Sequence, residues 1–457
     1  MTTERNKYQE QTLFEITWPL FIEISLRMSM GILATLILSG YSDNAVAGVG
    51  VANQIMIIFI FVFNVTAIGA TILIGQNLGA NRLAEARRIA RSAFGFNVWV
   101  GIILTVALVA GRERILGFYG LSGEVYQYAN TFLTVTGLFL FLEAVSSALS
   151  AILRSYGYTK ESMVVTVVTN VISLFGYLIA IRGWFGLPVT GVFGISVSIV
   201  LARLFLMTTL FYFVYQRLRL RFYLKDAFSI NKTDVKALLS IGIPSAGENL
   251  SYQLSQVVIT SFVAMIGDAA LAARVYILNI SMFCYLFTFA MAQGTQILVA
   301  RFIGARQYRR ALKRGLKTLG ISMLVSTAVA LLVAITGRTL LSLFTDDPEI
   351  LAIAVPVLWA IVFIEPGRAM NLVLMSSLKS AGDVRFPVVI GIISMWGVAV
   401  SLSYVLGISF AIGLLGVWIA QGIDEWLRGF FALKRWISQP WKKRSLLREK
   451  SGESHSY

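Results

Sequence analysis

Apolar runs of about twenty residues or more recur along the whole chain, and they constrain its fold more than any other feature of the sequence. A helix needs roughly 20 apolar residues, at about 1.5 Å each, to cross a hydrocarbon layer about 30 Å thick. The runs are continuous and do not alternate in polarity, which disfavours a β-barrel. Twelve runs are predicted to be transmembrane helices, near residues 14–40, 51–78, 92–111, 127–152, 162–181, 189–215, 237–266, 276–300, 318–336, 350–377, 386–408 and 412–433.

The composition agrees with a bilayer as the surrounding solvent. The chain is 57% hydrophobic and 14% charged, whereas soluble domains are about 45–50% apolar and about 25% charged. Its one cysteine, Cys284, and its one histidine, His455, provide no disulfide framework and no metal site. No Walker A, GxGxxG or CxxC motif is present, so an enzyme or an ATP-driven pump is disfavoured and no cofactor is expected.

The basic residues predict the orientation of the chain. Of the 39 lysines and arginines, 30 fall in segments on one side of the twelve predicted spans when both termini share that side. Five lie on the other side: Arg112, Arg114, Arg182, Arg274 and Arg338. The remaining four lie within predicted spans: Arg27, Arg203, Arg368 and Arg428. Because basic segments stay in the cytoplasm, the chain is predicted to lie in a bacterial cytoplasmic (inner) membrane with both termini cytoplasmic. This distribution also explains the net charge of +16 without nucleic acid as a partner.

An internal repeat with a constant offset of 225 in the numbering runs through loops as well as helices. It pairs Gly79 with Gly304 and Pro19 with Pro244, and it aligns LRSYG at 153–157 with LKSAG at 378–382. Each repeat carries six helices, an even number, so both enter the membrane from the same side. The predicted fold is an all-α polytopic membrane protein with twelve transmembrane helices in two parallel six-helix lobes, related by a pseudo-two-fold axis along the membrane normal.

The repeat divides the chain into five expected parts. A cytoplasmic tail, 1–12, precedes the first lobe at 13–216, and the second lobe spans 237–436. The polar, basic connection 217–236 is expected to be a cytoplasmic linker, and 437–457 a basic cytoplasmic tail. Two such lobes favour transport by alternating exposure of a cleft to the two sides.

Several motifs resemble those of one family over roughly residues 13–436. They are WPLFIE at the start of the first span, GYSDNAVAGVGVANQI, GQNLGANRLAEARR, LRSYGYTK, IGIPSAGENLSYQLSQ, ARFIGA and LKSAGDVRFP. The chain resembles the multidrug and toxic-compound extrusion (MATE) antiporters. The resemblance implies a V-shaped pair of six-helix lobes that exports drugs or metabolites in exchange for protons or sodium. Family members commonly carry an aspartate in the middle of the first span, where this chain has Ala34.

Two carboxylates occupy matching places in the repeats. Glu23 and Glu248 are related by the same offset, and each follows a proline by four residues. A charge inside a bilayer costs about 2.5–3.5 kcal/mol, so it needs a partner, water or a function. The two glutamates are candidates for ion coupling or for binding a cationic substrate; alternatively, each forms hydrogen bonds within its own lobe. Arg27, one turn after Glu23, is a candidate partner for it.

Charged residues elsewhere in the spans offer a second set of candidates. Glu143 and Arg368 also occupy matching places in the repeats, and Glu365 precedes Arg368 by one helical turn. Two ion pairs are possible for Arg368: one with Glu365 on the same helix, and one with Glu143 that would bridge the two lobes. Such a pair would either neutralise charge structurally or act as a gate. Polar residues in the seventh span form a candidate cavity-lining stripe, with hydrogen bonding between helices as the alternative: Asn249, Tyr252, Gln253 and Gln256.

The leading functional hypothesis is a secondary active antiporter that exports small organic molecules, cationic or aromatic, and is driven by a proton or sodium gradient. The expected partners are the small-molecule substrate, H+ or Na+ at a position the sequence does not assign, and the lipid bilayer; a monomer is expected. The alternatives are a flippase for lipids or lipid-linked oligosaccharides and a membrane partner that does not transport.

The orientation is testable with single cysteines in a Cys284→Ala background. A cysteine at Lys225, in the connection 217–236, is expected to resist a membrane-impermeant maleimide in intact cells, because the positive-inside rule places it in the cytoplasm. A cysteine at Arg114 is expected to react. Labelling of the Lys225 position in intact cells would contradict the predicted topology.

Overall fold

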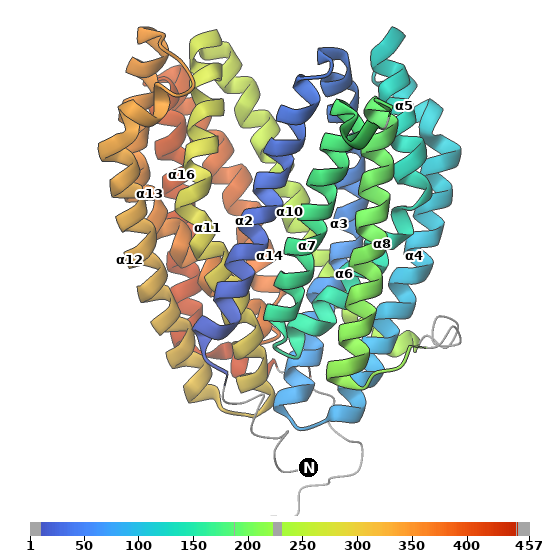
Figure 1. Cartoon of the computed structure of the whole chain (residues 1–457). Helices are drawn as coiled ribbons and strands as arrows, with labels where there is room; N and C mark the ends of the chain where they lie inside the picture. Colours follow the sequence, from blue (N-terminus) through green and yellow to red (C-terminus); the bar gives the residue numbers. More distant parts are fainter. Residues whose placement is uncertain (1–10, 187, 223–230, 445, 447–457) are drawn as a thin grey trace, which may run out of the picture. The chain divides into compact units, whose positions relative to one another are not determined.

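The chain is described by a computed structural model that covers residues 11–186, 188–222, 231–444 and 446 (Figure 1). The regular structure of these residues is helical, and they contain no strand. In the first repeat the helices are α2 (Leu13–Ser39), α3 (Asp43–Gly79), α4 (Leu83–Phe118), α5 (Gly123–Leu138), α6 (Leu140–Ser155), α7 (Thr159–Arg182), the short η1 (Trp184–Gly186) and α8 (Gly191–Leu218).

The second repeat follows the same order. Its helices are α10 (Lys232–Ile266), α11 (Asp268–Gly304), α12 (Tyr308–Leu341), α13 (Pro348–Ser380), α14 (Arg385–Ser394), η2 (Met395–Val400), α15 (Ser401–Tyr404), η3 (Val405–Ser409), α16 (Leu414–Ser438) and η4 (Pro440–Lys443). The segments η2 and η3 are π-helical turns that continue α14 and α15. The bounds of α3 and α11 keep the offset of 225 at both ends, as the repeat predicts.

Each of the twelve predicted runs overlaps a helical segment of the described chain. Among the described residues, nine helices are long and apolar enough to cross a bilayer, and the bent pair α5 and α6 makes a tenth. The two remaining runs correspond to α10 and α16, which contain more polar and charged side chains. The helices extend past the predicted runs: α3 and α11 have 37 residues each, about 55 Å at 1.5 Å per residue, so their polar ends reach beyond the hydrocarbon layer.

The fourth predicted span, 127–152, is not one straight helix. The structure breaks it at Phe139, where α5 and α6 meet at an angle of 52°. The break leaves the Phe141 backbone N–H without a helical partner, and it donates instead to the Thr105 hydroxyl of α4 at 3.1 Å. A long-range hydrogen bond of this kind is not visible in an apolar pattern, which explains why the sequence predicted one helix here.

Two compact units make up the described chain, and their boundaries do not follow the two repeats. Unit 1 comprises Met1–Thr17, Gly75–Asn81 and Ile243–Tyr457, and unit 2 comprises Trp18–Ile74 and Arg82–Gly242. The start of α2 and the end of α3 thus belong to unit 1, and the start of α10 belongs to unit 2. The predicted division into tails, lobes and linker stays a prediction, and its residues 1–10, 223–230, 445 and 447–457 lie outside the described part.

The starts of α2 and α10 and the end of α3 belong to the unit that holds most of the other repeat, and we call them the exchanged helix ends. Small residues bring them close to their neighbours. Within unit 2, a Cβ atom on Gly69 of α3 would lie 2.5 Å from the Leu238 carbonyl oxygen of α10. Within unit 1, a Cβ atom on Gly294 of α11 would lie 2.4 Å from the Thr17 hydroxyl and 3.5 Å from Leu13 of α2. Gly69 matches Gly294, and Leu13 matches Leu238, at the offset of 225. The first helix of each repeat therefore begins against the second helix of the other repeat.

The ends of α3 and α11 cross at still shorter range within unit 1. A Cβ atom on Gly79 would lie 1.9 Å from the Arg301 carbonyl oxygen, and one on Gly304 would lie 1.8 Å from the Gln76 carbonyl oxygen. Gln76 and Arg301 are themselves matched by the repeat, so the same contact is made twice. Glycine at these positions lets two helix backbones touch, as small residues do in membrane helix packing.

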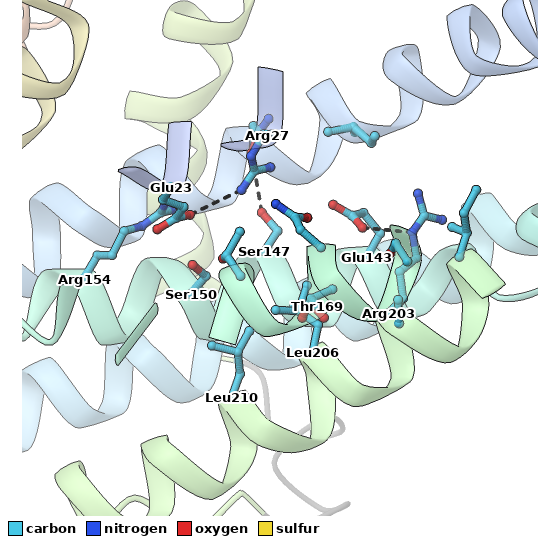
Figure 2. Close-up of a pocket in the computed structure, with 18 of the residues that line it drawn as sticks. Glu23, Arg27, Glu143, Ser147, Ser150, Arg154, Thr169, Arg203, Leu206 and Leu210 are labelled. Atoms are coloured by element: carbon cyan, nitrogen blue, oxygen red, sulfur yellow. Dashed lines mark hydrogen bonds and ion pairs between the residues drawn. The ribbon is translucent and has the colours of Figure 1, made fainter. Parts of the chain in front are cut away.

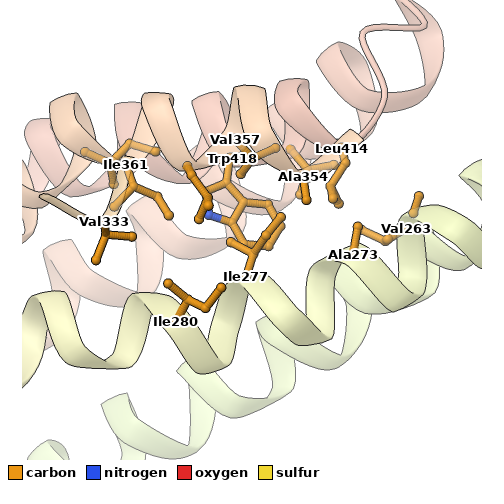
Figure 3. Close-up of a cluster of buried hydrophobic side chains, with 14 of the residues drawn as sticks. Val263, Ala273, Ile277, Ile280, Val333, Ala354, Val357, Ile361, Leu414 and Trp418 are labelled. Atoms are coloured by element: carbon orange, nitrogen blue, oxygen red, sulfur yellow. The ribbon is translucent and has the colours of Figure 1, made fainter. Parts of the chain in front are cut away.

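Apolar side chains fill the interior of unit 1. Ile277 and Ile280 of α11 lie against Val333 of α12, Ile361 of α13 and Trp418 of α16 (Figure 3). A separate buried cluster in unit 2 includes Phe63, Leu133 and Leu140. These clusters hold the helices on which the charged residues of the next section lie.

The crossing of α3 and α11 predicts a position-specific effect of methyl groups. Gly79→Ala and Gly304→Ala are each expected to destabilise the fold by about 1–3 kcal/mol, because the backbones must separate to admit the methyl group. Gly117→Ala in α4 is the matched control, since no atom lies within 4 Å of its missing Cβ. Thermal unfolding in detergent measures the difference, and three equal melting temperatures would contradict the crossing.

Candidate functional site

Glu23 is buried on α2, one turn after Pro19, with 1% of its surface exposed. Its Oε1 atom accepts hydrogen bonds from Arg154 Nη1 at 3.1 Å and from Arg27 Nη2 at 3.3 Å. Its Oε2 atom accepts a hydrogen bond from the Ser162 hydroxyl at 3.1 Å. Arg154 comes from the end of α6 and Ser162 from α7, so the carboxylate joins three helices of unit 2. The expected Glu23–Arg27 contact is present, and both carboxylate oxygens already have partners.

Glu248 makes the matching contact in the second repeat. Lys379, near the end of α13, lies 2.6 Å from Glu248 Oε2 through its Nζ atom. Gly391 of α14 leaves room for the carboxylate, because a Cβ atom there would lie 3.2 Å from Glu248 Oε1. Lys379 matches Arg154 in the repeat, as Glu248 matches Glu23, so the glutamate–cation pair is built twice, buried at Glu23 and half-buried at Glu248.

The two basic partners were not among the residues predicted for the site. The signal that finds them is present in the repeat, since Arg154 lies in LRSYG and Lys379 in the aligned LKSAG. A basic residue matched at the same offset as a buried acid is a candidate partner, because buried charges need compensation.

A cavity of about 200 Å³ lies among α2, α3, α6, α7 and α8 of unit 2 (Figure 2). At one end lie Glu23, Arg27 and Arg154. At the other end Glu143 of α6 pairs with Arg203 of α8, at 3.2 Å between Oε2 and Nε. Polar side chains make up much of the wall between the two ends: Asn64, Ser146, Ser147, Ser150, Thr166, Thr169, Asn170, Ser173 and Tyr177.

A second group of charges lies within unit 1. Arg368 Nη1 of α13 donates to Glu365 Oε1 at 2.5 Å, and its Nε atom lies 3.5 Å from Glu425 Oε1 of α16. Arg428 pairs with Asp424 and lies 3.5 Å from Glu425 Oε2. Of the two partners considered for Arg368, Glu365 is therefore the one in contact, and Glu143 has Arg203 as its partner. Glu365 is 1% exposed.

Neutral groups complete this second network. Asn371 Nδ2 donates to Glu425 Oε2 at 2.7 Å, and the Ser394 hydroxyl donates to Asp424 Oδ1 at 2.5 Å. Buried carboxylates with both charged and neutral donors are compensated in a low-dielectric interior. The Arg368 guanidinium also lies over the Tyr285 ring, 5.4 Å from its centroid.

The predicted polar stripe on α10 splits into two environments. Asn249, Tyr252 and Gln253 are exposed. Gln256 instead accepts a hydrogen bond from Arg274 Nη2 of α11 at 2.9 Å. Arg274 is 2% exposed and lies over the Trp418 ring, so Gln256 and the indole ring contact a buried guanidinium. Cavity lining by the exposed part of the stripe stays a prediction.

The chain is similar to membrane transporters along nearly its whole length. The MatE family model matches residues 19–179 and 244–405, two ranges whose first residues keep the offset of the repeat. The uncharacterized transporter YisQ of Bacillus subtilis is 41% identical over 435 residues, which cover 95% of this chain and 96% of YisQ. The probable multidrug resistance protein NorM of Thermotoga maritima is 28% identical, with 95% of this chain and 94% of NorM covered.

Solved structures agree in fold. An outward-facing multidrug resistance MATE family transporter of the MOP superfamily superposes with a TM-score of 0.87 at 18% identity, over 96% of this chain and 98% of that chain. A MOP superfamily transporter from Pyrococcus furiosus, whose binding pocket is described as reversed in polarity, gives a TM-score of 0.83 at 18% identity, over 93% and 95%. The likeness confirms the predicted fold class, an all-α polytopic membrane protein with twelve helices in two lobes.

The Glu143–Arg203 pair predicts a non-additive effect on stability. Arg203→Gln is expected to destabilise the fold by on the order of 3 kcal/mol, because it leaves the largely buried Glu143 carboxylate without its cation. The double variant Glu143→Gln with Arg203→Gln is expected to recover most of the loss. Thermal unfolding in detergent, followed by tryptophan fluorescence, measures both. A double variant no more stable than Arg203→Gln alone would show that the pair is not coupled.

Proposed function

The chain belongs to the MatE family of membrane transporters, and from this premise we propose that it is a secondary active antiporter. It exports small organic molecules, drug-like compounds or metabolites, in exchange for protons or sodium. The gradient of that ion is the energy source, and no other cofactor takes part. The observation that carries the proposal is the glutamate–cation pair built at the buried Glu23 and again at the half-buried Glu248.

Such a pair offers a physical link between ion binding and helix movement. In the ionised state Glu23 holds α2 to α6 and α7 through Arg154 and Ser162. A proton on the carboxylate removes the charge that Arg154 compensates and weakens these contacts. Sodium at a carboxylate oxygen competes with the same donors. Ion entry from outside therefore loosens contacts that are made in the ion-free state.

The exchanged helix ends support alternating access as the mode of transport. The first helix of each repeat begins on the second helix of the other repeat, through Gly69 with Leu238 and through Gly294 with Leu13. These short contacts lie at the ends of helices that the basic residues assign to the cytoplasmic side. Opening a path to the cytoplasm breaks them, and closing it restores them. Packed helix ends with two discrete arrangements are suited to such a switch.

The proposed cellular setting is the one that the sequence predicts. The protein acts as a monomer in a bacterial cytoplasmic membrane with both termini inside the cell.

One observation favours the second candidate function, a lipid flippase: three arginines line the cavity of unit 2. A cavity of about 200 Å³ is smaller than ordinary ligand sites of about 300–1,000 Å³, so an oligosaccharide head group does not fit. Small-molecule export is the better-supported function.

The coupling role is tested by removing each charge without changing side-chain size. Glu23→Gln and Glu248→Gln are expected to lose most gradient-driven efflux of a fluorescent dye from inside-out vesicles while the protein remains expressed and folded, since the glutamine cannot ionise. Glu113→Gln, at an exposed carboxylate, is the matched control and is expected to retain transport. Efflux that responds to neither a pH nor a sodium gradient in the unmodified protein would refute the antiport mechanism.

A further inference from the structure

We propose that the cavity of unit 2 binds the acidic group of an organic anion, a carboxylate, sulfonate or phosphate carried on a small molecule. The inference rests on the proposed transport of small organic molecules and specifies the charge of the group bound in this cavity. It differs from the cationic substrate for which the sequence made Glu23 and Glu248 candidates.

The charges around the cavity do not balance. Three guanidinium groups line it, those of Arg27, Arg154 and Arg203, against two carboxylates, those of Glu23 and Glu143. The lining therefore carries one excess positive charge when all five groups are ionised, and protonation of either glutamate increases the excess. A ligand with one negative charge is the occupant that restores the balance of charge.

Hydrogen-bond donors are in excess as well. Glu23 already accepts three hydrogen bonds, from Arg27, Arg154 and Ser162. Arg203 Nη1 and Asn170 Nδ2 are both buried and have no hydrogen-bond partner among the described residues. Both are donors only, and a buried donor without an acceptor costs about 1–3 kcal/mol. The oxygen atoms of an acidic group are acceptors only and match these donors.

Arg27 is placed to take part in binding. Its side chain is 63% exposed, and one of its nitrogens contacts Glu23. A guanidinium has five N–H donors in a planar fork that suits the two oxygens of a carboxylate or phosphate. The exposed part of the Arg27 guanidinium is therefore accessible to a ligand at this end of the cavity.

The second repeat compensates its own basic residues. Arg368, Lys379 and Arg428 stand at the positions that match Glu143, Arg154 and Arg203, the position that matches Arg27 is Tyr252, and unit 1 adds three carboxylates that the first repeat lacks. These are Glu365, Asp424 and Glu425, and the matching residues of the first repeat are Leu140, Ile199 and Val200. The two units thus differ in the source of the compensating negative charge. In unit 1 it comes from carboxylates of the chain, and in unit 2 it comes from the bound ligand.

The proposal is tested by equilibrium binding to the purified full-length protein in detergent, with two probes of similar size and opposite charge. These are para-fluorobenzenesulfonate and para-fluorobenzylammonium, titrated by fluorine NMR. The unmodified protein is expected to bind the sulfonate at least about tenfold more tightly, since one unit charge at a few ångströms contributes more than about 1.4 kcal/mol at an effective dielectric constant of about 20. No gradient is involved, so a failure of coupled transport leaves this result unaffected.

Variants that change the cavity charge in both directions make the test specific. Arg27→Gln removes the excess charge and is expected to weaken sulfonate binding about tenfold, whereas Glu143→Gln adds to the excess and is expected to strengthen it. Lys236→Gln removes a positive charge from an exposed site on α10 outside the cavity, and is expected to change nothing. Binding of neither probe, equal binding of both, or a loss of sulfonate binding that is the same for Lys236→Gln as for Arg27→Gln would overturn the proposal.

The source of the anion is decided by repeating the titration in lipid nanodiscs. Sulfonate binding that is equal in phosphatidylcholine and phosphatidylglycerol nanodiscs supports a soluble organic anion as the ligand. Sulfonate that is displaced only in phosphatidylglycerol nanodiscs supports the same anion site with a lipid phosphate as its occupant. In both cases Arg27→Gln is expected to abolish the preference for the sulfonate.

Discussion

The constraint on which the rest of the structure depends is that a charge placed in an apolar span must be compensated. Glu23 is 1% exposed and is held by Arg27 one turn along its own helix and by Arg154 and Ser162 from two other helices. Glu248 repeats the arrangement with Lys379. Each pair joins the first helix of a repeat to the end of a later one. The same contacts therefore stabilise the bundle and connect its packing to any event that neutralises a carboxylate.

Duplication provided two copies of this scaffold, and the copies then diverged in charge. Glu143 pairs with Arg203 in the first repeat, whereas the matching positions in the second repeat hold two arginines, Arg368 and Arg428. The second repeat compensates them with acids on α13 and α16, and these side chains are paired within the unit. The first repeat keeps a polar cavity with positive charge in excess. The asymmetry assigns ligand binding to one unit and internal compensation to the other.

Much of the fold follows from the order of residues along the chain. Continuous apolar runs predicted the helices, and the offset of 225 predicted that α3 and α11 would share their bounds. Helical spacing predicted the contacts of Arg27 with Glu23 and of Arg368 with Glu365. The break at Phe139 was not predicted, because the hydrogen bond that satisfies the freed Phe141 N–H comes from another helix, at the Thr105 hydroxyl. Arg154 and Lys379 were missed because no local pattern connects them to residues more than a hundred positions away.

The sequence alone determined the helices, the repeat and the family, because hydrophobic length and residue spacing are properties of a single segment and can be read without knowing its neighbours. The tertiary structure decided which charges meet, since a pairing such as Glu23 with Arg154 depends on how three helices pack. It also decided that Glu23 has no free oxygen, whereas the buried atoms Arg203 Nη1 and Asn170 Nδ2 have no hydrogen-bond partner among the described residues. Whether a charge is compensated depends on all the groups that surround it in space, and these come from several helices whose arrangement only the packing determines.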